Sequence, residues 1–305
     1  MRRTGEQLLL VSAAVYGVST TVSVVALRVV RPVDLLAVEI TGAAAMLMTS
    51  AAARGRLRRR GALRQMLLGA LVPGLAFLFG DLGLARTSAS SGSLLLAAEP
   101  LLSVLLAVVV LRERLSRGAA IALIAGLAGS GLVALGSGTS GDDTTLGNTL
   151  VLLAVLAAAV FLIATRRFNG NGAGLNESAW QSTGGALSVV PFVAASWSTG
   201  GTRLDTVGVA GWAACIAVVL CGAAGSVTFN QGIARVPAAR AAQLGNLTPV
   251  VGTLTAVLFL GDRPALLQLA GGAAILAGLA LLLYEQDKPA FTDRPHRPVS
   301  ERSMS

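Results

Sequence analysis

Long apolar runs separated by short polar stretches make up most of this chain. The runs fall at roughly 8–27, 33–53, 66–85, 89–111, 118–136, 147–165, 178–197, 208–229, 238–260 and 266–284, and each is near the ~20 residues that a helix needs to cross a bilayer. Apolar runs of this length, without the alternation of a half-buried strand, indicate membrane-spanning helices. The pattern predicts an all-α polytopic membrane protein with ten transmembrane helices.

The segments 85–135 and 234–284 are similar in sequence. Pro100 aligns with Pro249 and Arg114 with Arg263 in one register. Matches among Ala, Leu, Val and Gly arise easily from composition, whereas a proline inside a helix and an arginine at a helix end do not. These matches predict an internal duplication, and an odd number of helices per copy turns the second copy upside down relative to the first.

The duplication predicts two inverted five-helix repeats with a solute site between them near the middle of the membrane. A stretch rich in Gly and Ser separates the repeats, and a polar stretch with several prolines follows the last apolar run. The second of these has the composition of a disordered segment. The predicted boundaries are 1–136 for the first repeat, 137–146 for an extracytoplasmic linker, 147–285 for the second repeat and 286–305 for a disordered cytoplasmic tail.

Composition and charge agree with a membrane protein. Charged residues make up 13% of the chain and hydrophobic residues 54%, against about 25% charged residues in soluble domains. The net charge of +9 could suggest a nucleic-acid partner, but the basic residues lie at the ends of apolar runs with few aromatic residues between them. The positive-inside rule accounts for them if both termini are cytoplasmic. We therefore expect no nucleic-acid partner and a multi-pass protein of the bacterial cytoplasmic (inner) membrane.

Three carboxylates, Glu39, Asp81 and Glu99, lie inside apolar runs. An ionised carboxylate at the centre of a membrane helix costs roughly 2.5–3.5 kcal/mol, so each needs water, a partner or a proton. Such a residue marks a functional site, unless it lies near the membrane interface or in a protonated packing contact. Both interpretations stay open for all three residues.

Glu99 precedes Pro100 in the middle of the fourth predicted helix. Proline donates no backbone hydrogen bond and leaves the carbonyl of Leu96 without its helical partner. A kink beside a carboxylate is a candidate ligand or proton site. The second copy has Thr248 and Pro249 at these positions, so it keeps the kink without the charge.

At aligned positions, the second half of the chain has neutral hydrogen-bonding residues where the first half has acids. Asn230 aligns with Asp81, and an approximate alignment sets Gln181 against Glu39. Polar stripes can also hold helices together, and this alternative is strongest where they contain only Ser and Thr. The predicted substrate-binding or coupling residues are Glu99, Asp81, Glu39, Tyr16, Asn230, Gln231, Gln243, Asn246 and Gln181, with helix breaks at Pro100 and Pro249.

Other motifs indicate packing rather than chemistry. Small residues one turn apart at Ala125 and Gly129, and at Ala274 and Gly278, are typical of close helix pairing. The two cysteines lie six residues apart in one apolar run, and the one histidine, His296, lies in the polar tail. The sequence therefore predicts no disulfide, no metal site and no cofactor.

The segment Leu96-Ala-Ala-Glu-Pro-Leu-Leu-Ser103, ending at Arg112-Glu-Arg114 and followed by Ile124-Ala-Gly-Leu-Ala-Gly129, resembles the EamA-type members of the drug/metabolite transporter superfamily. The second copy, from Pro249 through Gly261-Asp-Arg263 to Gly278, matches more loosely. The resemblance implies a ten-helix inner-membrane carrier with two inverted repeats. It also implies export of amino acids, metabolites or drugs, driven by a proton or substrate gradient.

We therefore expect a secondary active transporter, an exporter of small metabolites, amino acids or drugs, that works by alternating access and is coupled to protons or to exchange. Its expected partners are a small organic solute, the lipid bilayer and the proton as candidate coupling ion, and the chain is expected to be a monomer or a homodimer. A non-transporting membrane scaffold or regulatory subunit is one alternative. An intramembrane enzyme is another, although without an intramembrane histidine only carboxylates and serines remain for its chemistry.

Overall fold

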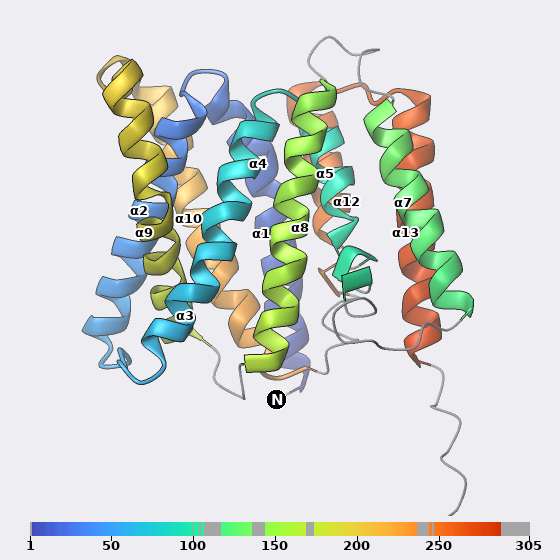
Figure 1. The fold of residues 1–305 in the computed structure, drawn as a ribbon, viewed down its shortest axis with the longest axis horizontal. Helices are drawn as coiled ribbons and strands as arrows, with labels where there is room; N and C mark the ends of the chain where they lie inside the picture. The colour runs from blue at the N-terminus through green and yellow to red at the C-terminus, as the bar shows by residue number, and fades with distance from the viewer. Residues whose placement is uncertain are drawn as a thin grey trace, which may run out of the picture.

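The computed structural model is a bundle of α-helices that run roughly side by side (Figure 1). It describes residues 2–99, 101–103, 105–106, 117–135, 144–168, 174–236, 244–245 and 247–287, and no strand occurs among them. The helices are α1 (Arg2–Leu27), α2 (Pro32–Ala53), α3 (Ala62–Gly69), α4 (Ala76–Leu84), α5 (Ala89–Leu96), α7 (Arg117–Leu135), α8 (Thr145–Phe168), α9 (Leu175–Gly200), α10 (Val209–Ile233), α12 (Leu247–Thr255) and α13 (Leu266–Asp287). Shorter elements are the π-helical η1 (Ala70–Leu75) and η3 (Ala256–Leu260) and the 3-10 helix η2 (Leu204–Thr206).

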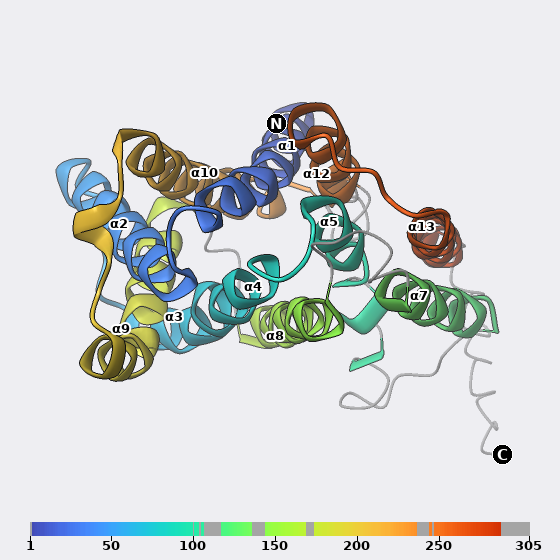
Figure 2. The same cartoon turned by 90° about the horizontal axis from the view of Figure 1, so that it is seen from above.

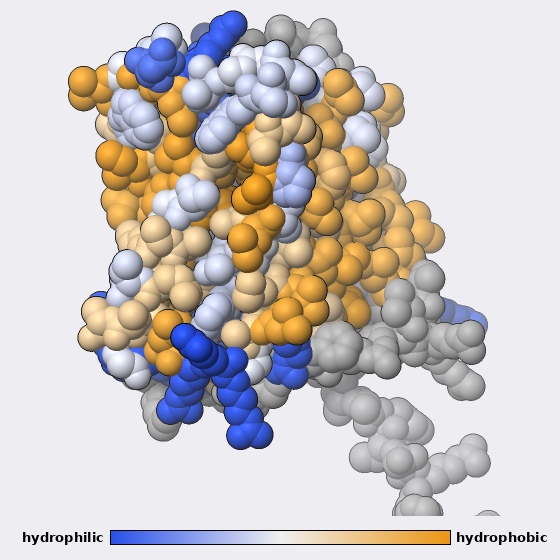
Figure 3. All heavy atoms as spheres, turned by 60° about the vertical axis from the view of Figure 1, so that its left-hand side comes forward, coloured by the Kyte–Doolittle hydropathy of each residue, from blue (hydrophilic) through white to orange (hydrophobic). Residues whose placement is uncertain are grey.

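Five helical segments of the described chain are long and apolar enough to cross a membrane. They are Thr4–Leu27, Pro32–Ala53, Ala62–Leu84, Thr145–Thr165 and Val209–Ile233. Shorter apolar helices lie at Ala120–Val133, Leu247–Leu260 and Leu266–Leu281. A broad apolar band separates two polar ends on the face of the molecule that Figure 3 shows, as a lipid-facing surface requires. The all-helical class predicted from the sequence is confirmed for the described residues.

One membrane-length segment, Ala62–Leu84, is interrupted in its middle. Between α3 and α4, η1 contains Val72 with φ −136° and ψ 117°, a non-helical conformation, directly before Pro73. Proline disfavours the helical conformation of the residue before it. On α9, a Cβ at Gly185 would lie 2.7 Å from Cγ of Pro73, so glycine there makes room for the proline ring. The hydrophobic pattern predicts one helix at 66–85, and this break is a difference from that prediction.

Helices from the two halves of the chain pack against each other throughout the bundle. α1 lies on α10 and α12, α2 on α9, and α4 on α8 (Figure 2). Glycines allow the closest approaches. A side chain at Gly69 on α3 would collide with the backbone of Gln181 on α9, and one at Gly184 on α9 would collide with the backbone of Met66.

α7 and α13 form a pair at one edge of the bundle (Figures 1 and 2). A Cβ at Gly129 would lie 2.6 Å from the backbone oxygen of Gly271, and one at Gly278 would lie 2.6 Å from that of Ala122. The helix-pairing role predicted for the small-residue motifs of these two helices is therefore confirmed.

Candidate functional site

Four of the predicted site residues lie on neighbouring segments inside the bundle. Glu39 on α2 is 5% exposed and Asp81 on α4 is 4% exposed, and the two carboxyl groups are close enough to interact electrostatically. Glu99, in a helical position after α5, is half-buried. Tyr16 on α1 is within electrostatic reach of both Glu39 and Glu99. We call these four residues the carboxylate cluster.

Asp81 has an unsatisfied oxygen in its buried side chain. Its Oδ2 is buried and has no hydrogen-bond partner among the described residues. Burying an acceptor without a partner costs free energy that a purely structural position would avoid. This oxygen is therefore available to a proton or to a donor group of a solute.

α10 presents small residues to the carboxylate cluster. A Cβ at Gly222 would lie 3.7 Å from Oε1 of Glu39, and one at Gly225 would lie 2.8 Å from Cε1 of Tyr16. These glycines are not among the site residues predicted from the sequence. Their spacing of about one helical turn is the signal that could have identified a common face.

Two predicted amide residues lie in a separate, hydrogen-bonded group. Nε2 of Gln181 on α9 donates to Oε1 of Gln65 on α3 at 2.9 Å. Nδ2 of Asn230 on α10 donates to Oγ of Ser178 at 2.7 Å and to Oε1 of Gln181 at 3.4 Å. All four side chains are buried. We call Gln65, Ser178, Gln181 and Asn230 the amide cluster.

The amide cluster and the carboxylate cluster lie at different depths of the bundle. With a rise of about 1.5 Å per helical residue, Asn230 lies roughly 12 Å along α10 from Gly222, which contacts Glu39. Asn230 is on the side of Ile233, where α10 ends near the N-terminus of the chain (Figure 1). The structure therefore does not place Asn230 directly opposite the acids.

The remaining predicted residues are more dispersed. Gln231 is half-buried on α10, next to Asn230, and its Cγ lies 3.9 Å from the position of a Cβ on Gly174. Pro249 is buried in the first turn of the described part of α12. Pro100, Gln243 and Asn246 lie outside the described residues.

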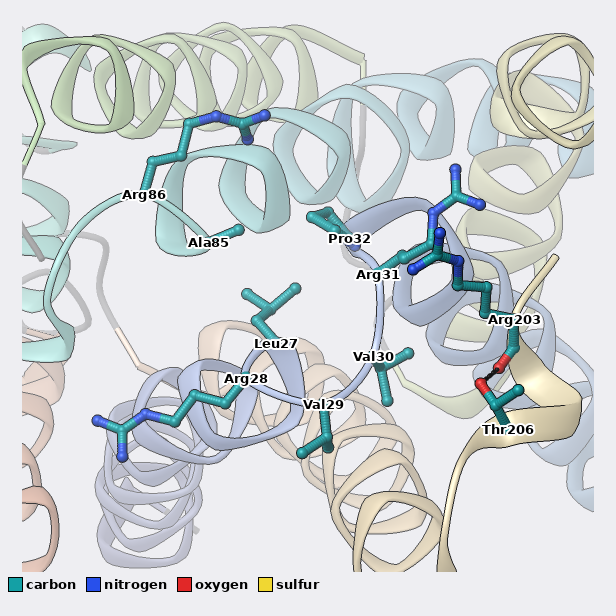
Figure 4. Close-up of a pocket in the computed structure, with 10 residues that line it drawn as sticks. All are labelled: Leu27, Arg28, Val29, Val30, Arg31, Pro32, Ala85, Arg86, Arg203 and Thr206. Atoms are coloured by element: carbon teal, nitrogen blue, oxygen red, sulfur yellow. Dashed lines mark hydrogen bonds between the residues drawn. The ribbon is translucent and has the colours of Figure 1, made fainter. Parts of the chain in front are cut away.

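A pocket of about 520 Å³ opens at the end of the bundle opposite the N-terminus (Figure 4). Three connections form its wall: the one between α1 and α2, the one between α4 and α5, and the one between α9 and α10. The lining residues are Leu27, Arg28, Val29, Val30, Arg31, Pro32, Ala85, Arg86, Arg203 and Thr206. We call it the arginine pocket. Asp81 lies one helical turn before Ala85, and the backbone N–H of Ala85 donates to the backbone oxygen of Asp81 at 3.0 Å.

The chain is similar to known membrane transporters. The model of the EamA-like transporter family matches residues 3–135 and 145–284. A "Probable terminal-alkyne amino-acid exporter" of Streptantibioticus cattleyicolor is 28% identical over 201 residues, which are 66% of this chain and 66% of the exporter, slightly less than two thirds of its length. The "Uncharacterized transporter YyaM" of Bacillus subtilis is 24% identical over 231 residues, or 72% of this chain and 74% of that protein.

A solved structure shares the fold. This crystal structure, described only as that of a protein, superposes with a TM-score of 0.62 at 20% sequence identity, and the match covers 95% of this chain and 100% of that one. At this identity the likeness concerns the arrangement of helices alone.

Proposed function

We propose that this chain, which belongs to the EamA-like transporter family, is a secondary active transporter that exports a small organic solute across the cytoplasmic membrane. The carboxylate cluster is the observation that carries this proposal. Glu39 and Asp81 are almost fully buried in the interior of a multi-pass membrane protein, where acids are costly and mark solute or proton pathways. The relatives named as an exporter and a transporter support the same function.

The proposed architecture is the one that the sequence predicts: ten spans in two inverted five-helix repeats, 1–136 and 147–285, with both termini cytoplasmic. The two separate matches of the family model, at 3–135 and 145–284, support a duplicated chain. Contacts of α1 with α10 and of α2 with α9 join helices of the two halves, which is where inverted-repeat transporters bind their solutes.

In this mechanism the carboxylate cluster is the central site. Asp81 and Glu39 bind either a proton or the cationic group of the solute, so that loading one releases the other. Tyr16 and Glu99 complete the side of the site formed by α1 and the segment after α5. Gly222 and Gly225 place no side chain between α10 and the cluster, so a shift of α10 against α1 and α2, as access alternates, would act directly on the site.

The solute that best fits this site carries an amine. An ammonium group is a three-fold donor, and the described residues of the cluster offer carboxylate and phenol oxygens as acceptors. The relative named as an amino-acid exporter supports amino acids and similar amine-bearing metabolites as the first solutes to examine.

A reconstitution experiment tests this function. The full chain is placed in liposomes that contain a pH-sensitive dye, and amino acids, amines and cationic drugs are added in turn. We expect proton flux with some of these solutes, and loss of that flux in Asp81→Asn and Glu99→Gln. Asp205→Asn, an exposed acid in η2, is the matched control and should behave like the unsubstituted chain.

The other outcomes separate the alternatives. If no solute moves protons, proton coupling is wrong, and counterflow of radiolabelled solutes decides whether the chain is an exchanger. If counterflow is also absent, the transport proposal fails. That result would favour the scaffold alternative, whereas unchanged flux with Gln or Asn at Glu39, Asp81 and Glu99 would show that transport does not use these carboxylates.

A further inference from the structure

Arginines gather around one pocket at the end of the bundle opposite the N-terminus. Among the described residues at that end, Arg28, Arg31, Arg86 and Arg203 line the arginine pocket, whereas Arg263 does not. The four come from three separate connections of the chain, so the fold brings them together. Basic residues are disfavoured on the outer side of a membrane protein, and the proposed orientation puts this end outside.

Two of the arginine side chains of this pocket are bonded to backbone oxygens of the described residues. None of the four arginine side chains forms an ion pair with a carboxylate of the described residues. Nη1 of Arg31 donates to the backbone oxygens of Gly200 and Gly201 at 3.2 and 2.8 Å. Nη1 of Arg86 donates to the backbone oxygen of Leu82 at 2.7 Å. A guanidinium has five N–H donors, so Arg31 and Arg86 each keep N–H donors that these bonds do not use. Positive side chains that line one pocket attract anions.

The wall that carries Arg203 is fixed rather than loose. The buried carboxylate of Asp34, at the start of α2, accepts from Nε1 of Trp197 at 2.8 Å and from the backbone N–H of Arg203 at 3.2 Å. The Oγ1 of Thr206 in turn donates to the backbone oxygen of Arg203 at 2.8 Å. These bonds hold the connection between α9 and α10 against α2, so this wall of the pocket has a defined position.

We propose that the arginine pocket binds the carboxylate of a small solute that also has an aliphatic part. Figure 4 shows the side chains of Leu27, Pro32 and Ala85 around the hollow, with the guanidinium groups of Arg31, Arg86 and Arg203 at its margin. Apolar groups inside and donors at the margin suit an aliphatic carboxylate: the chain lies inside and the carboxylate meets guanidinium N–H groups.

This site lies next to the carboxylate cluster and has the opposite charge. Arg86 follows Asp81 by five residues, in the turn after the end of α4, which is about 7.5 Å at the helical rise of about 1.5 Å per residue. Only this placement on the transport path rests on the proposed function; binding of a carboxylate does not. A solute with both an amine and a carboxylate would meet the two sites one after the other as it leaves.

Binding can be measured without transport. The purified full chain in phosphatidylcholine nanodiscs is titrated with butyrate, and the midpoint of thermal unfolding is recorded; butylammonium, with the same chain and the opposite charge, is the solute control. We expect butyrate to raise the midpoint in a saturable way and butylammonium to leave it unchanged. Arg86→Gln and Arg203→Gln should each weaken butyrate binding about tenfold, because each removes a charged donor. Arg263→Gln, at the same end but outside the pocket, should have no effect.

Three results would overturn the proposal: no saturable effect of butyrate, equal effects in all variants, or an arginine-dependent effect of phosphatidylglycerol in the nanodisc in place of butyrate, which would identify a lipid site. The flux assay on the unsubstituted chain separates this proposal from the proposed function. Butyrate binding without any solute flux rejects the transporter alone, and flux without butyrate binding rejects the pocket alone.

Discussion

Tyr16 on α1 lies directly against Gly225 on α10. A Cβ at position 225 would be 2.8 Å from Cε1 and 2.9 Å from Cζ of the tyrosine ring, so the contact leaves no room for a side chain. On the same turn of α10, the backbone oxygen of Gly225 accepts from Oγ of Ser12 at 3.0 Å. Two helices from different halves of the chain are thus held together beside the carboxylate cluster.

Gly225→Ala should reduce transport about tenfold or more, because the added methyl group displaces the Tyr16 ring and a small misplacement at a binding site costs that much. Solute flux in liposomes measures it. The matched control is Gly131→Ala on α7, where a Cβ would meet nothing within 4 Å. Both changes raise helix propensity equally, so unimpaired flux in Gly225→Ala would show that the position of Tyr16 is not required.

Asp81→Asn should leave the protein as stable as before or more stable, although it abolishes coupled flux. The buried Oδ2 of Asp81 has no partner among the described residues, and a neutral amide is less costly to bury than a carboxylate. Functional sites commonly sacrifice stability in this way. The measurement is the midpoint of thermal unfolding in detergent. A midpoint several degrees lower would contradict a functional origin for this unsatisfied acid.

Gln181→Leu should destabilise the protein by about 1–3 kcal/mol, the usual cost of leaving buried hydrogen-bond partners unsatisfied. It removes the donor to Gln65 and the second acceptor of Asn230. Thermal unfolding in detergent reports the change. Gln231→Leu, at a half-buried amide outside the amide cluster, should shift the midpoint less, and equal shifts would show that the hydrogen bonds of the cluster contribute little.

Asp34→Ala should release the connection between α9 and α10. The backbone N–H of Arg203 loses its carboxylate acceptor, and hydrogen bonds to charged groups contribute enough that its exchange with solvent should accelerate about tenfold or more. Hydrogen exchange followed by mass spectrometry measures the peptide that contains Arg203. Asp205→Ala removes an exposed acid from the same connection and should leave the exchange rate unchanged.

The helices could be predicted from the sequence because membrane thickness sets a minimum length for each apolar run. The run predicted at 33–53 is α2, Pro32–Ala53, in the structure. The break before Pro73 was missed because the hydropathy of that segment does not change there; only the backbone restriction imposed by proline signals it.

The site was harder to predict, because alignment of the two copies gives equivalent positions but no depths in the bundle. Glu39 and Asp81 are predicted from the cost of a charge in an apolar run, a property of single residues, and both are buried in the bundle. Gln181 was paired with Glu39 by alignment, yet its side chain bonds to Gln65 and Asn230. The convergence of four arginines depends on which connections are neighbours, and a linear sequence does not contain that information.

The hydrogen bond between Trp197 and Asp34 makes the fluorescence of Trp197 a measure of the structure at this end of the molecule. Indole emission shifts to longer wavelength when water reaches the ring, and the chain contains three tryptophans. In a variant with Trp180→Phe and Trp212→Phe, the emission would come from Trp197 alone, whose indole is bonded to Asp34 next to the arginine pocket. Opening and closing of this end of the molecule could then be followed in real time, without any attached dye.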